Sequence, residues 1–476
     1  MSLRIYNTLT GKKEQFIPVN KGKVGIYICG PTVYDTSHIG HARSVVVFDV
    51  VYRWFKHLSY EVKYVRNFTD VDDKIIKKSN ETGDECSVIT NKYIDEFHNE
   101  MDALNVLRPD VEPRATEHID HIIKFIEKLI EKGKAYHIKG GDVYFSIESF
   151  KEYGKLSNRK LEDMKAGSRI AVDENKKSPF DFTLWKPAKE GEPFWESPWG
   201  NGRPGWHIEC SAMSYEYLNM PFDIHGGGKD LIFPHHENEI AQSEALYDRQ
   251  FVKYWMHNGF VDINNEKMSK SLGNFTMIKE VLAKYPAEVI RFFLLSKHYR
   301  SPIDYNEDSM KESYASLDRV YTFLERAEKA GARKDDSKHG RLWDDFTLAM
   351  NDDFNSARAI ASIFDSVKKG NTTLDKQEQN QDYAKQEIDT IYSDLKKMGE
   401  LLGIFLLKPS QYFDEKNRQV MEDQKIDPKE IDNLIEKRNK ARADKDFAKA
   451  DEIRDKLQAM NIILKDGPKG TTWKTE

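Results

Sequence analysis

Residues Val24–His41 read VGIYICGPTVYDTSHIGH and decide the fold of this 476-residue chain. The segment begins with a β-rich run to Ile28, breaks at Gly30-Pro31 and enters a helical pattern near Ile39. A strand that leads into a helix N-terminus places free backbone N–H groups, and the positive end of the helix dipole, where a phosphate can bind. We therefore expect a phosphate-binding site here.

Two histidines, His38 and His41, stand at the start of the expected helix, with Gly40 between them. Their spacing puts both rings on one turn, and Gly40 leaves room for close backbone approach. Both rings can donate hydrogen bonds to a phosphate. The chain lacks the P-loop lysine motif, so a phosphate here would be held without it. A helix cap or a surface feature is the alternative interpretation of this pair.

The composition indicates about two to four folded domains in a chain of this length. No apolar run reaches the length of a membrane span, and the N-terminus lacks the apolar core of a signal peptide, so we expect a cytoplasmic protein without a membrane partner. Three cysteines without a C-x-x-C pair argue against a disulfide framework and leave metal binding or catalysis as their uses. The net charge of −6 gives no global support for a nucleic-acid partner, although a local basic face is sufficient for one.

Strand, helix and strand follow one another after residue 24, which predicts a right-handed βαβ unit with a parallel sheet. The helix is expected at 42–57 and the second strand at 61–66, where polarity alternates. Such sheets bind ligands at the carboxyl ends of their strands. Residues 67–73 (NFTDVDD) either face that crevice or form an acidic loop that caps a helix at 74–78.

Turn residues and periodicity predict the later elements. Residues 153–204 are irregular and read as an insertion into the sheet domain, in which some structure must be hidden because so long a loop is rare. The other expected elements are a hairpin at 137–147, a helix at 205–218, a strand at 222–225, a helix that starts at Pro234 and a strand at 256–263.

Long amphipathic helices dominate from about residue 304 to 406, with an inter-helix loop expected at 371–382. A linker near 408–414 leads to a helical hairpin at 428–443 and 446–460. The predicted fold class is therefore α/β: a Rossmann-type parallel-sheet domain with an insertion, then an α-helical bundle and a small C-terminal domain. The expected bounds are 1–310 for the sheet domain, about 115–205 for its inserted connective segment, 311–406 for the bundle and 415–476 for the C-terminal domain.

Scattered side chains suggest a metal site. His235 and Glu239 lie four residues apart on the expected helix and so share a face, whereas His236 is expected to point elsewhere. Cys29 and Cys210 are the soft ligands near the crevice, and two thiolates, an imidazole and a carboxylate form an acceptable zinc set. The alternative is two small buried cysteines and a solvated His/Glu pair.

Two short motifs resemble the signatures of class I aminoacyl-tRNA synthetases. Thr36–His41 (TSHIGH) resembles the first signature, and Lys267–Ser271 (KMSKS) matches the second letter for letter. The segments ICGPTVYD, GWHIECSAM and HGGGKDLIFPHHENEIAQ, and the tail around Phe447–Asp451, closely resemble cysteinyl-tRNA synthetases. This resemblance runs essentially from end to end, with the motifs in the family's order.

The resemblance implies ATP-dependent ligation of L-cysteine to tRNA(Cys) through a cysteinyl-adenylate. It implies one zinc ion per chain, which selects the cysteine thiol over the serine hydroxyl because a thiol ionises more readily on a borderline-soft cation. The implied zinc ligands are Cys29, Cys210, His235 and Glu239. Because a catalytic zinc usually has three protein ligands, the substrate thiolate must be a fifth ligand or displace one.

The resemblance also implies the remaining site residues. The cysteine carboxylate would attack the α-phosphorus of ATP, and the protein would supply alignment and charge stabilisation, with Mg²⁺ bridging the leaving oxygens. The implied catalytic residues are His38, His41, Lys267 and Lys270. The expected ATP contacts are His38, Gly40, His41, Gly226, Gly227, Asp230 and Lys270, with ribose or the substrate ammonium as alternatives for Asp230. Cys29 and Trp206 would line the cysteine pocket, unless Trp206 is an ordinary core aromatic.

By the same resemblance the bundle and the tail read the anticodon of a tRNA, with Trp473, Arg438 and Arg442 as candidates and a monomer as the expected state. A solvated helix surface is the alternative interpretation of each arginine. A small-molecule adenylyltransferase, or a cysteine ligase that acts on an amino sugar, would share the catalytic core. The long region after residue 310 argues against both, because a small acceptor needs no anticodon reader. A zinc-stabilised RNA-binding protein on an inactive scaffold would predict damaged signatures, whereas both are intact.

Overall fold

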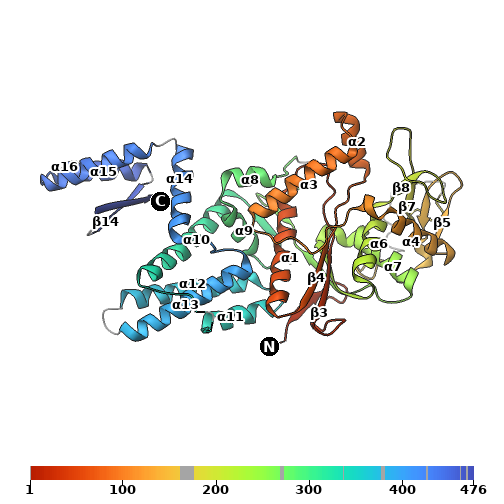
Figure 1. Ribbon diagram of the computed structural model, residues 1–476, viewed down its shortest axis with the longest axis horizontal. Helices are drawn as coiled ribbons and strands as arrows, with labels where there is room; N and C mark the ends of the chain where they lie inside the picture. The colour runs from red at the N-terminus through yellow and green to blue at the C-terminus, as the bar shows by residue number, and fades with distance from the viewer. Residues whose placement is uncertain are drawn as a thin grey trace.

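The computed structural model describes residues 2–160, 176–268, 273–335, 337–376, 381–424, 427–460, 462–467 and 470–475. The molecule is elongated (Figure 1), with a parallel sheet near its middle, an inserted antiparallel sheet at one end and helices towards the C-terminus at the other. None of the helices in these ranges is both long and apolar enough to cross a membrane.

The central sheet is parallel, with the strand order β10-β9-β3-β4. Its strands are β3 (Lys23–Ile28), β4 (Glu61–Arg66), β9 (Phe222–Gly228) and β10 (Val252–Asn258). Helix α1 (Ile39–His57) joins β3 to β4, so the predicted βαβ unit is confirmed. Residue Ile26 faces Tyr64 on one side and Ile224 on the other, and all three are buried. The hydrophobic core therefore covers the middle of the sheet.

The loops that follow β3 and β4 meet at the carboxyl edge of the sheet. A Cβ at Gly30 would lie 1.6 Å from the backbone oxygen of Asn67, so only glycine allows this approach. The Asn67 side chain accepts a hydrogen bond from the Gly30 N–H (3.0 Å), while the Asp72 side chain accepts one from the Lys74 N–H (2.9 Å) and caps α2 (Asp73–Thr82). Both interpretations of 67–73 hold: its start faces the crevice and its end caps a helix.

The segment between β4 and β9 is built from helices and a second sheet. Three helices precede this sheet, namely α2, α3 (Cys86–Ala103) and α4 (Ile119–Glu131). The sheet is antiparallel and consists of β5 (Ala135–His137), β6 (Val143–Phe145), β7 (Phe182–Pro187) and β8 (Gly202–Pro204). The predicted hairpin is β5–β6, and β7 and β8 are the structure hidden in the irregular stretch.

Two helices complete the crevice, α6 (Trp206–Leu218) and α7 (Glu237–Tyr247). The helix expected from Pro234 is wrong at its start, because a π-helical turn at Ile232–His236 precedes α7. Phe233 has φ −139° and ψ 130°, outside the helical region, as expected for a residue before proline. The strand expected at 256–263 is two strands, β10 and β11 (Val261–Ile263).

Short elements surround this core. They are β1 (Arg4–Asn7), β2 (Lys12–Gln15), β12 (Glu266–Lys267), β13 (Ile303–Tyr305), α8 (Ile278–Lys284) and α9 (Ala287–Leu295). Helix α8 follows the second signature loop. Strand β11 pairs with both β12 and β13.

The helical bundle packs against the sheet domain in one continuous hydrophobic core. Its helices are α10 (Glu307–Lys329), α11 (Arg341–Met350), α12 (Ser356–Asp375) and α13 (Gln381–Leu402). Buried Arg291 of α9 pairs with Asp49 of α1 and donates to the Leu402 backbone oxygen (2.6 Å), which ties three parts of the fold together. The loop expected at 371–382 is shorter, because α12 continues to residue 375.

The C-terminal part begins with a helix rather than the expected linker, since α14 (Pro409–Gln424) covers most of 408–414. Tyr412 of α14 stacks on Tyr321 of α10 (3.9 Å), and its hydroxyl donates to Asp318 (2.8 Å). The helical hairpin is confirmed as α15 (Pro428–Ala443) and α16 (Phe447–Ala459). Two antiparallel strands follow, β14 (Ile462–Gly467) and β15 (Gly470–Thr475).

Candidate active site and metal centre

Backbone hydrogen bonds join the start of α1 to the segment that follows the second signature. The Ile39 N–H donates to the Thr276 oxygen (2.9 Å), and the Ile278 N–H donates to the Ser37 oxygen (2.9 Å). The first signature and the segment that follows the second, more than two hundred residues apart in sequence, therefore lie side by side.

The rings of His38 and His41 stack with their centroids 3.8 Å apart. The His41 Nδ1 accepts a hydrogen bond from the His38 backbone N–H (3.3 Å), which leaves the His41 Nε2 as the N–H donor. Burial lowers the pKa of His38 to about 4 and that of His41 well below its usual value. Both rings are therefore neutral at physiological pH and offer hydrogen bonds rather than positive charge.

Gly40 brings the second signature close to these rings. A Cβ at this position would lie 3.0 Å from the His38 ring and 3.1 Å from the Met268 methyl carbon. Lys267 lies in β12 with its Nζ 4.3 Å from the centre of the Phe260 ring, a cation–π contact. Lys270 lies outside the described residues.

The glycines at the end of β9 allow neighbouring side chains to pack closely, in addition to the room that they were predicted to leave for a nucleotide. A Cβ at Gly226 would lie 2.3 Å from the ring of Phe48, so this glycine lets α1 pack on the sheet. A Cβ at Gly227 would lie 2.8 Å from the Leu231 side chain, and Asp230 is exposed nearby. Nucleotide contacts by these residues stay a prediction.

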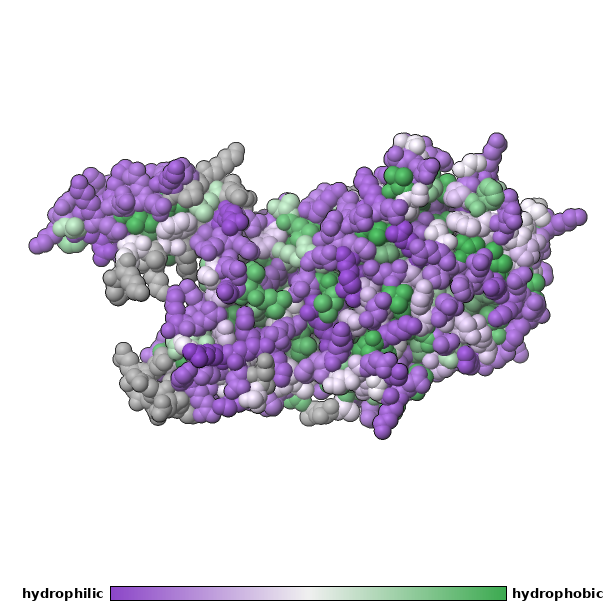
Figure 2. All heavy atoms as spheres, viewed as in Figure 1, coloured by the Kyte–Doolittle hydropathy of each residue, from purple (hydrophilic) through white to green (hydrophobic). Residues whose placement is uncertain are grey.

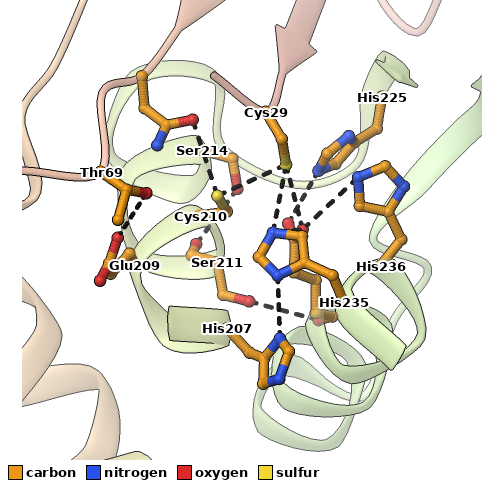
Figure 3. A network of polar contacts seen from close by, with 12 residues as sticks. Cys29, Thr69, His207, Glu209, Cys210, Ser211, Ser214, His225, His235 and His236 are labelled. Atoms are coloured by element: carbon orange, nitrogen blue, oxygen red, sulfur yellow. Dashed lines mark hydrogen bonds and ion pairs between the residues drawn. The ribbon is translucent and has the colours of Figure 1, made fainter. Parts of the chain in front are cut away.

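Four segments bring the predicted metal ligands together. Cys29 follows β3, Cys210 lies in α6, His235 in the π-helical turn and Glu239 in α7. The Cys29 Sγ lies 3.5 Å from the Cys210 Sγ, 3.5 Å from the His235 Nε2 and 3.4 Å from the Glu239 Oε1. Figure 3 shows Cys29 pointing at both Cys210 and the ring of His235. All four donor atoms lie within 4.8 Å of one another.

The chemistry of this donor set fits a divalent cation. Burial raises the pKa of Cys29 and Cys210, so that both thiols are protonated unless a cation stabilises the thiolates. Burial also lowers the pKa of His235 well below its usual value, which keeps the imidazole neutral, as a metal ligand requires. Two sulfurs, one nitrogen and one carboxylate oxygen are consistent with a zinc site.

Two further histidines orient the ligands, and the sequence interpretation did not select them. The His225 Nε2 lies 2.8 Å from the Glu239 Oε2, which leaves the Oε1 of that carboxylate towards Cys29. The His207 Nδ1 lies 2.9 Å from the His235 Nδ1, which leaves the His235 Nε2 for the cluster. Such contacts fix the tautomer and the direction of metal ligands. In the sequence, these two histidines are marked only by their position beside predicted site residues, since His207 adjoins Trp206 and His225 precedes the glycines.

His236 does not simply point elsewhere. Its Nδ1 lies 2.8 Å from the His257 Nε2, yet it also belongs to a second group of donor atoms within 4.8 Å. That group consists of Cys29, His225, His236 and Glu239. The two groups share Cys29 and Glu239, so a metal bound at either position excludes the other.

We expect His225→Asn to weaken zinc binding by about 10- to 100-fold, because Glu239 loses the contact that orients it. Competition with a chromophoric chelator measures this change. The matched control is His137→Asn at the exposed end of β5, which should bind zinc like the unmodified protein. Equal affinity in both variants would contradict an orienting role for His225.

Trp206 is not an ordinary core aromatic. It is 39% exposed, its ring stacks on that of His235 with centroids 4.2 Å apart, and it lines a cavity of about 430 Å³. His207 and Phe233 line the same cavity. Trp206 therefore lies between the four predicted metal ligands and a space large enough for a small ligand.

The fold and the paired signature segments define a class I aminoacyl-tRNA synthetase. Residues 15–315 match the family of tRNA synthetases class I (C) catalytic domains, 345–406 match the DALR domain, and 428–473 match the cysteinyl-tRNA ligase anticodon binding domain. The solved methionyl-tRNA synthetase of Mycobacterium tuberculosis, bound by methionyl-adenylate, shares the fold with a TM-score of 0.57 at 14% identity, covering 78% of this chain and 89% of that one.

Curated relatives narrow the class to one family. The cysteine–tRNA ligase of Geotalea daltonii is 53% identical over 492 residues, covering 99% of both chains. That of Geobacter sulfurreducens is 52% identical over 492 residues, covering 100% of both. The chain belongs to the cysteine–tRNA ligase family.

Proposed function

We propose that the chain ligates L-cysteine to tRNA(Cys) and that the cluster of Cys29, Cys210, His235 and Glu239 holds one zinc ion that selects the thiol. The observation that carries this proposal is the position of the cluster. It lies at the carboxyl edge of the parallel sheet, and Trp206 separates it from the adjoining cavity.

Size alone cannot separate cysteine from serine, because a pocket that accepts the larger thiol also admits the smaller alcohol. Bound zinc would supply a borderline-soft Lewis acid that favours a thiolate over a hydroxyl. The protein's own contribution is to hold the four donor atoms in place: His207 fixes the ring of His235, and His225 fixes the carboxylate of Glu239.

For activation, the substrate carboxylate attacks the α-phosphorus of ATP and pyrophosphate leaves. Mg²⁺ would supply part of the charge neutralisation that this step needs. We assign the hydrogen bonds to the phosphates to neutral His38 and His41 at the start of α1. We assign charge neutralisation to Lys267 and Lys270 of the second signature. In this arrangement the positive charge comes from the lysines and the helix dipole, and the histidines supply direction.

The test is aminoacylation of a tRNA(Cys) transcript by the zinc-loaded protein, with radiolabelled cysteine or serine. We expect cysteine to appear on tRNA(Cys) and on no tRNA of another specificity. Cysteine-dependent release of pyrophosphate without transfer to tRNA(Cys) would instead favour a ligase with a small acceptor, and no release at all would remove the synthetase assignment.

We propose the division 1–310 for the catalytic domain, with its connective insertion at about 115–205, 311–406 for the bundle and 415–476 for the C-terminal domain. The last two would bind the tRNA, and we expect a cytoplasmic monomer, which sedimentation of the full chain tests. Figure 2 shows the visible face over α15 and α16 as mostly hydrophilic, with a few hydrophobic residues among the polar ones.

The residues that could contact the anticodon differ in whether their side chains are free to bind a base. Arg438 forms two hydrogen bonds to Asp466 (2.9 and 2.8 Å), and Arg442 forms a third (2.7 Å), so both guanidinium groups support the fold of this domain. Trp473 packs against the domain's hydrophobic cluster. Phe447, at the start of α16, is 64% exposed and has the free ring face that an unpaired base needs.

We expect Phe447→Ala to raise the KM for tRNA(Cys) by about 5- to 150-fold, the range that the loss of one stacked base gives. Steady-state aminoacylation measures it, and cysteine-dependent ATP–pyrophosphate exchange should stay unchanged because the catalytic domain is intact. Ile17→Ala, which truncates another exposed apolar side chain, is the control and should leave this KM unchanged. An unchanged KM in Phe447→Ala would remove the stacking role.

A further inference from the structure

Tyr27 of β3 lies against the predicted metal ligands from the side of the sheet. It pairs in register with His225 of β9, and the two rings meet edge to face with their centroids 5.2 Å apart. The Cys29 N–H still donates to the Gly226 oxygen (3.3 Å), so the alternation of the strand continues to Cys29 and places its side chain on the same face as that of Tyr27. Tyr27 also packs in the hydrophobic cluster that contains Cys210.

The hydroxyl of Tyr27 is the unusual group at this position. The residue is 0% exposed, and its hydroxyl forms no hydrogen bond with any of the described residues. Buried hydroxyl groups are normally hydrogen-bonded, because the loss of their contact with water is costly. The structure therefore holds an unused O–H donor next to the metal ligands.

The hydrogen bonds of the Cys210 thiol suit a protonated sulfur alone. The Cys210 Sγ donates to the Asn67 Oδ1 (3.7 Å), and this oxygen is fixed because it also accepts from the Gly30 N–H (3.0 Å). A thiol that binds a metal ion loses its proton. The thiolate of Cys210 then has nothing to donate to Asn67 and becomes an acceptor that needs a donor.

The electrostatic influence between Tyr27 and Cys210 has the sign expected for such a pair. Burial is the largest influence and raises the pKa of both groups. Against burial, the Tyr27 hydroxyl acts to lower the pKa of the Cys210 thiol, while that thiol acts to raise the pKa of Tyr27 further. A hydroxyl that donates to a thiolate has these two effects, since it stabilises the charged sulfur and is itself kept protonated.

We propose that Tyr27 is a positioning residue of the metal site and donates its O–H to the thiolate of Cys210 when a metal ion is bound. This inference rests on the zinc site of the proposed function. The hydrogen bond draws electron density from the sulfur, so the bound metal ion keeps more of its positive charge for the thiolate of the substrate. Tyr27 thus acts through Cys210.

The experiment compares Tyr27→Phe with the unmodified full chain after cobalt(II) has been loaded in place of zinc. The substitution keeps the ring on His225 and removes only the hydroxyl. We expect the thiolate-to-cobalt charge-transfer band to move to longer wavelength, because the electrons of the sulfur are no longer stabilised by a hydrogen bond. Competition with a chromophoric chelator should show zinc affinity lower by about 10- to 100-fold.

The matched control is Tyr64→Phe in the neighbouring strand β4. Tyr64 is 1% exposed, and its hydroxyl also forms no hydrogen bond with the described residues. Its register partner is Ile26, so its side chain lies on the opposite face of the sheet, where its ring contacts that of Tyr52 in α1 (5.2 Å). We expect Tyr64→Phe to leave both the cobalt band and the zinc affinity unchanged.

The outcomes separate this inference from the proposed function. An unshifted band in Tyr27→Phe would overturn the hydrogen bond, even with weaker zinc binding, because a loss of packing lowers affinity without changing the sulfur. An equal shift in Tyr64→Phe would overturn it as well. Failure of the unmodified chain to bind one cobalt or zinc ion would remove the zinc site itself, and this inference with it.

Discussion

Cys210→Ser is expected to lose bound zinc and cysteine-dependent ATP–pyrophosphate exchange together. The thiol of Cys210 is buried and lies 3.5 Å from that of Cys29, and a serine hydroxyl cannot supply a soft, ionisable donor there. Loss of a group that only supports a metal ligand costs about 10- to 100-fold in affinity or activity, and we expect removal of the ligand itself to exceed that range. Zinc content per chain and the exchange rate are the two measurements.

The third cysteine provides the matched control. Cys86 is the first residue of α3, is partly exposed and does not belong to either group of possible metal ligands. Cys86→Ser should keep one zinc per chain and full exchange activity. If Cys210→Ser retained both, the cluster would have no part in cysteine activation.

His41→Asn is expected to lower the rate of cysteine-dependent exchange by about 100- to 1,000-fold, the usual cost of one hydrogen-bond donor to the charge that develops in a transition state. The ring of His41 is held by the His38 backbone N–H and by stacking, so its Nε2–H has a fixed direction that the shorter amide cannot reproduce. His137→Asn, in the inserted sheet, should leave the rate unchanged. A loss below tenfold would contradict the assigned role.

The same pair gives a pH dependence with a definite sign. Burial lowers the pKa of His38 from 6.5 to about 4 and that of His41 well below its usual value, so neither ring gains a proton between about pH 6 and 8. These groups should leave the exchange rate flat across that range, whereas an inflection near 6.5 would indicate cationic histidines. The free energy of unfolding should fall as the pH drops from 6.5 towards 4, because the unfolded chain binds protons there that the folded chain does not.

The sequence was sufficient for the βαβ unit because Glu61–Arg66 and the segment from Val24 alternate and end at turn residues. The resemblance also placed the predicted metal ligands Cys29 and Cys210 by motif, and the structure brings their sulfur atoms within 3.5 Å of each other. The sequence pattern failed at Pro234, where a π-helical turn replaces the expected first turn of helix. Local propensity does not predict such a turn, because π-helical turns are rare and occur as single turns beside α-helices.

The sequence also could not predict the contacts that hold the site residues in place. His225 and Glu239 belong to different elements, and only the folded crevice reveals their 2.8 Å contact. The sequence pattern placed Arg438 on a helix as a free basic side chain, but in the structure its guanidinium group pairs with the carboxylate of Asp466 in β14. The exposure of Phe447 likewise follows from how α15 and α16 pack, because an aromatic residue in a helical pattern is more often buried.

The central claim is that one zinc ion, held by the cluster of four side chains, binds the substrate side chain and so selects cysteine over serine. Its most direct test is ATP–pyrophosphate exchange by the zinc-loaded protein with cysteine and with serine as the only amino acid, repeated after zinc is removed by a chelator. We predict exchange with cysteine, none above background with serine, and loss of the cysteine signal that returns when zinc is restored. Selective exchange with cysteine in the zinc-free protein, or equal exchange with serine, would contradict the claim.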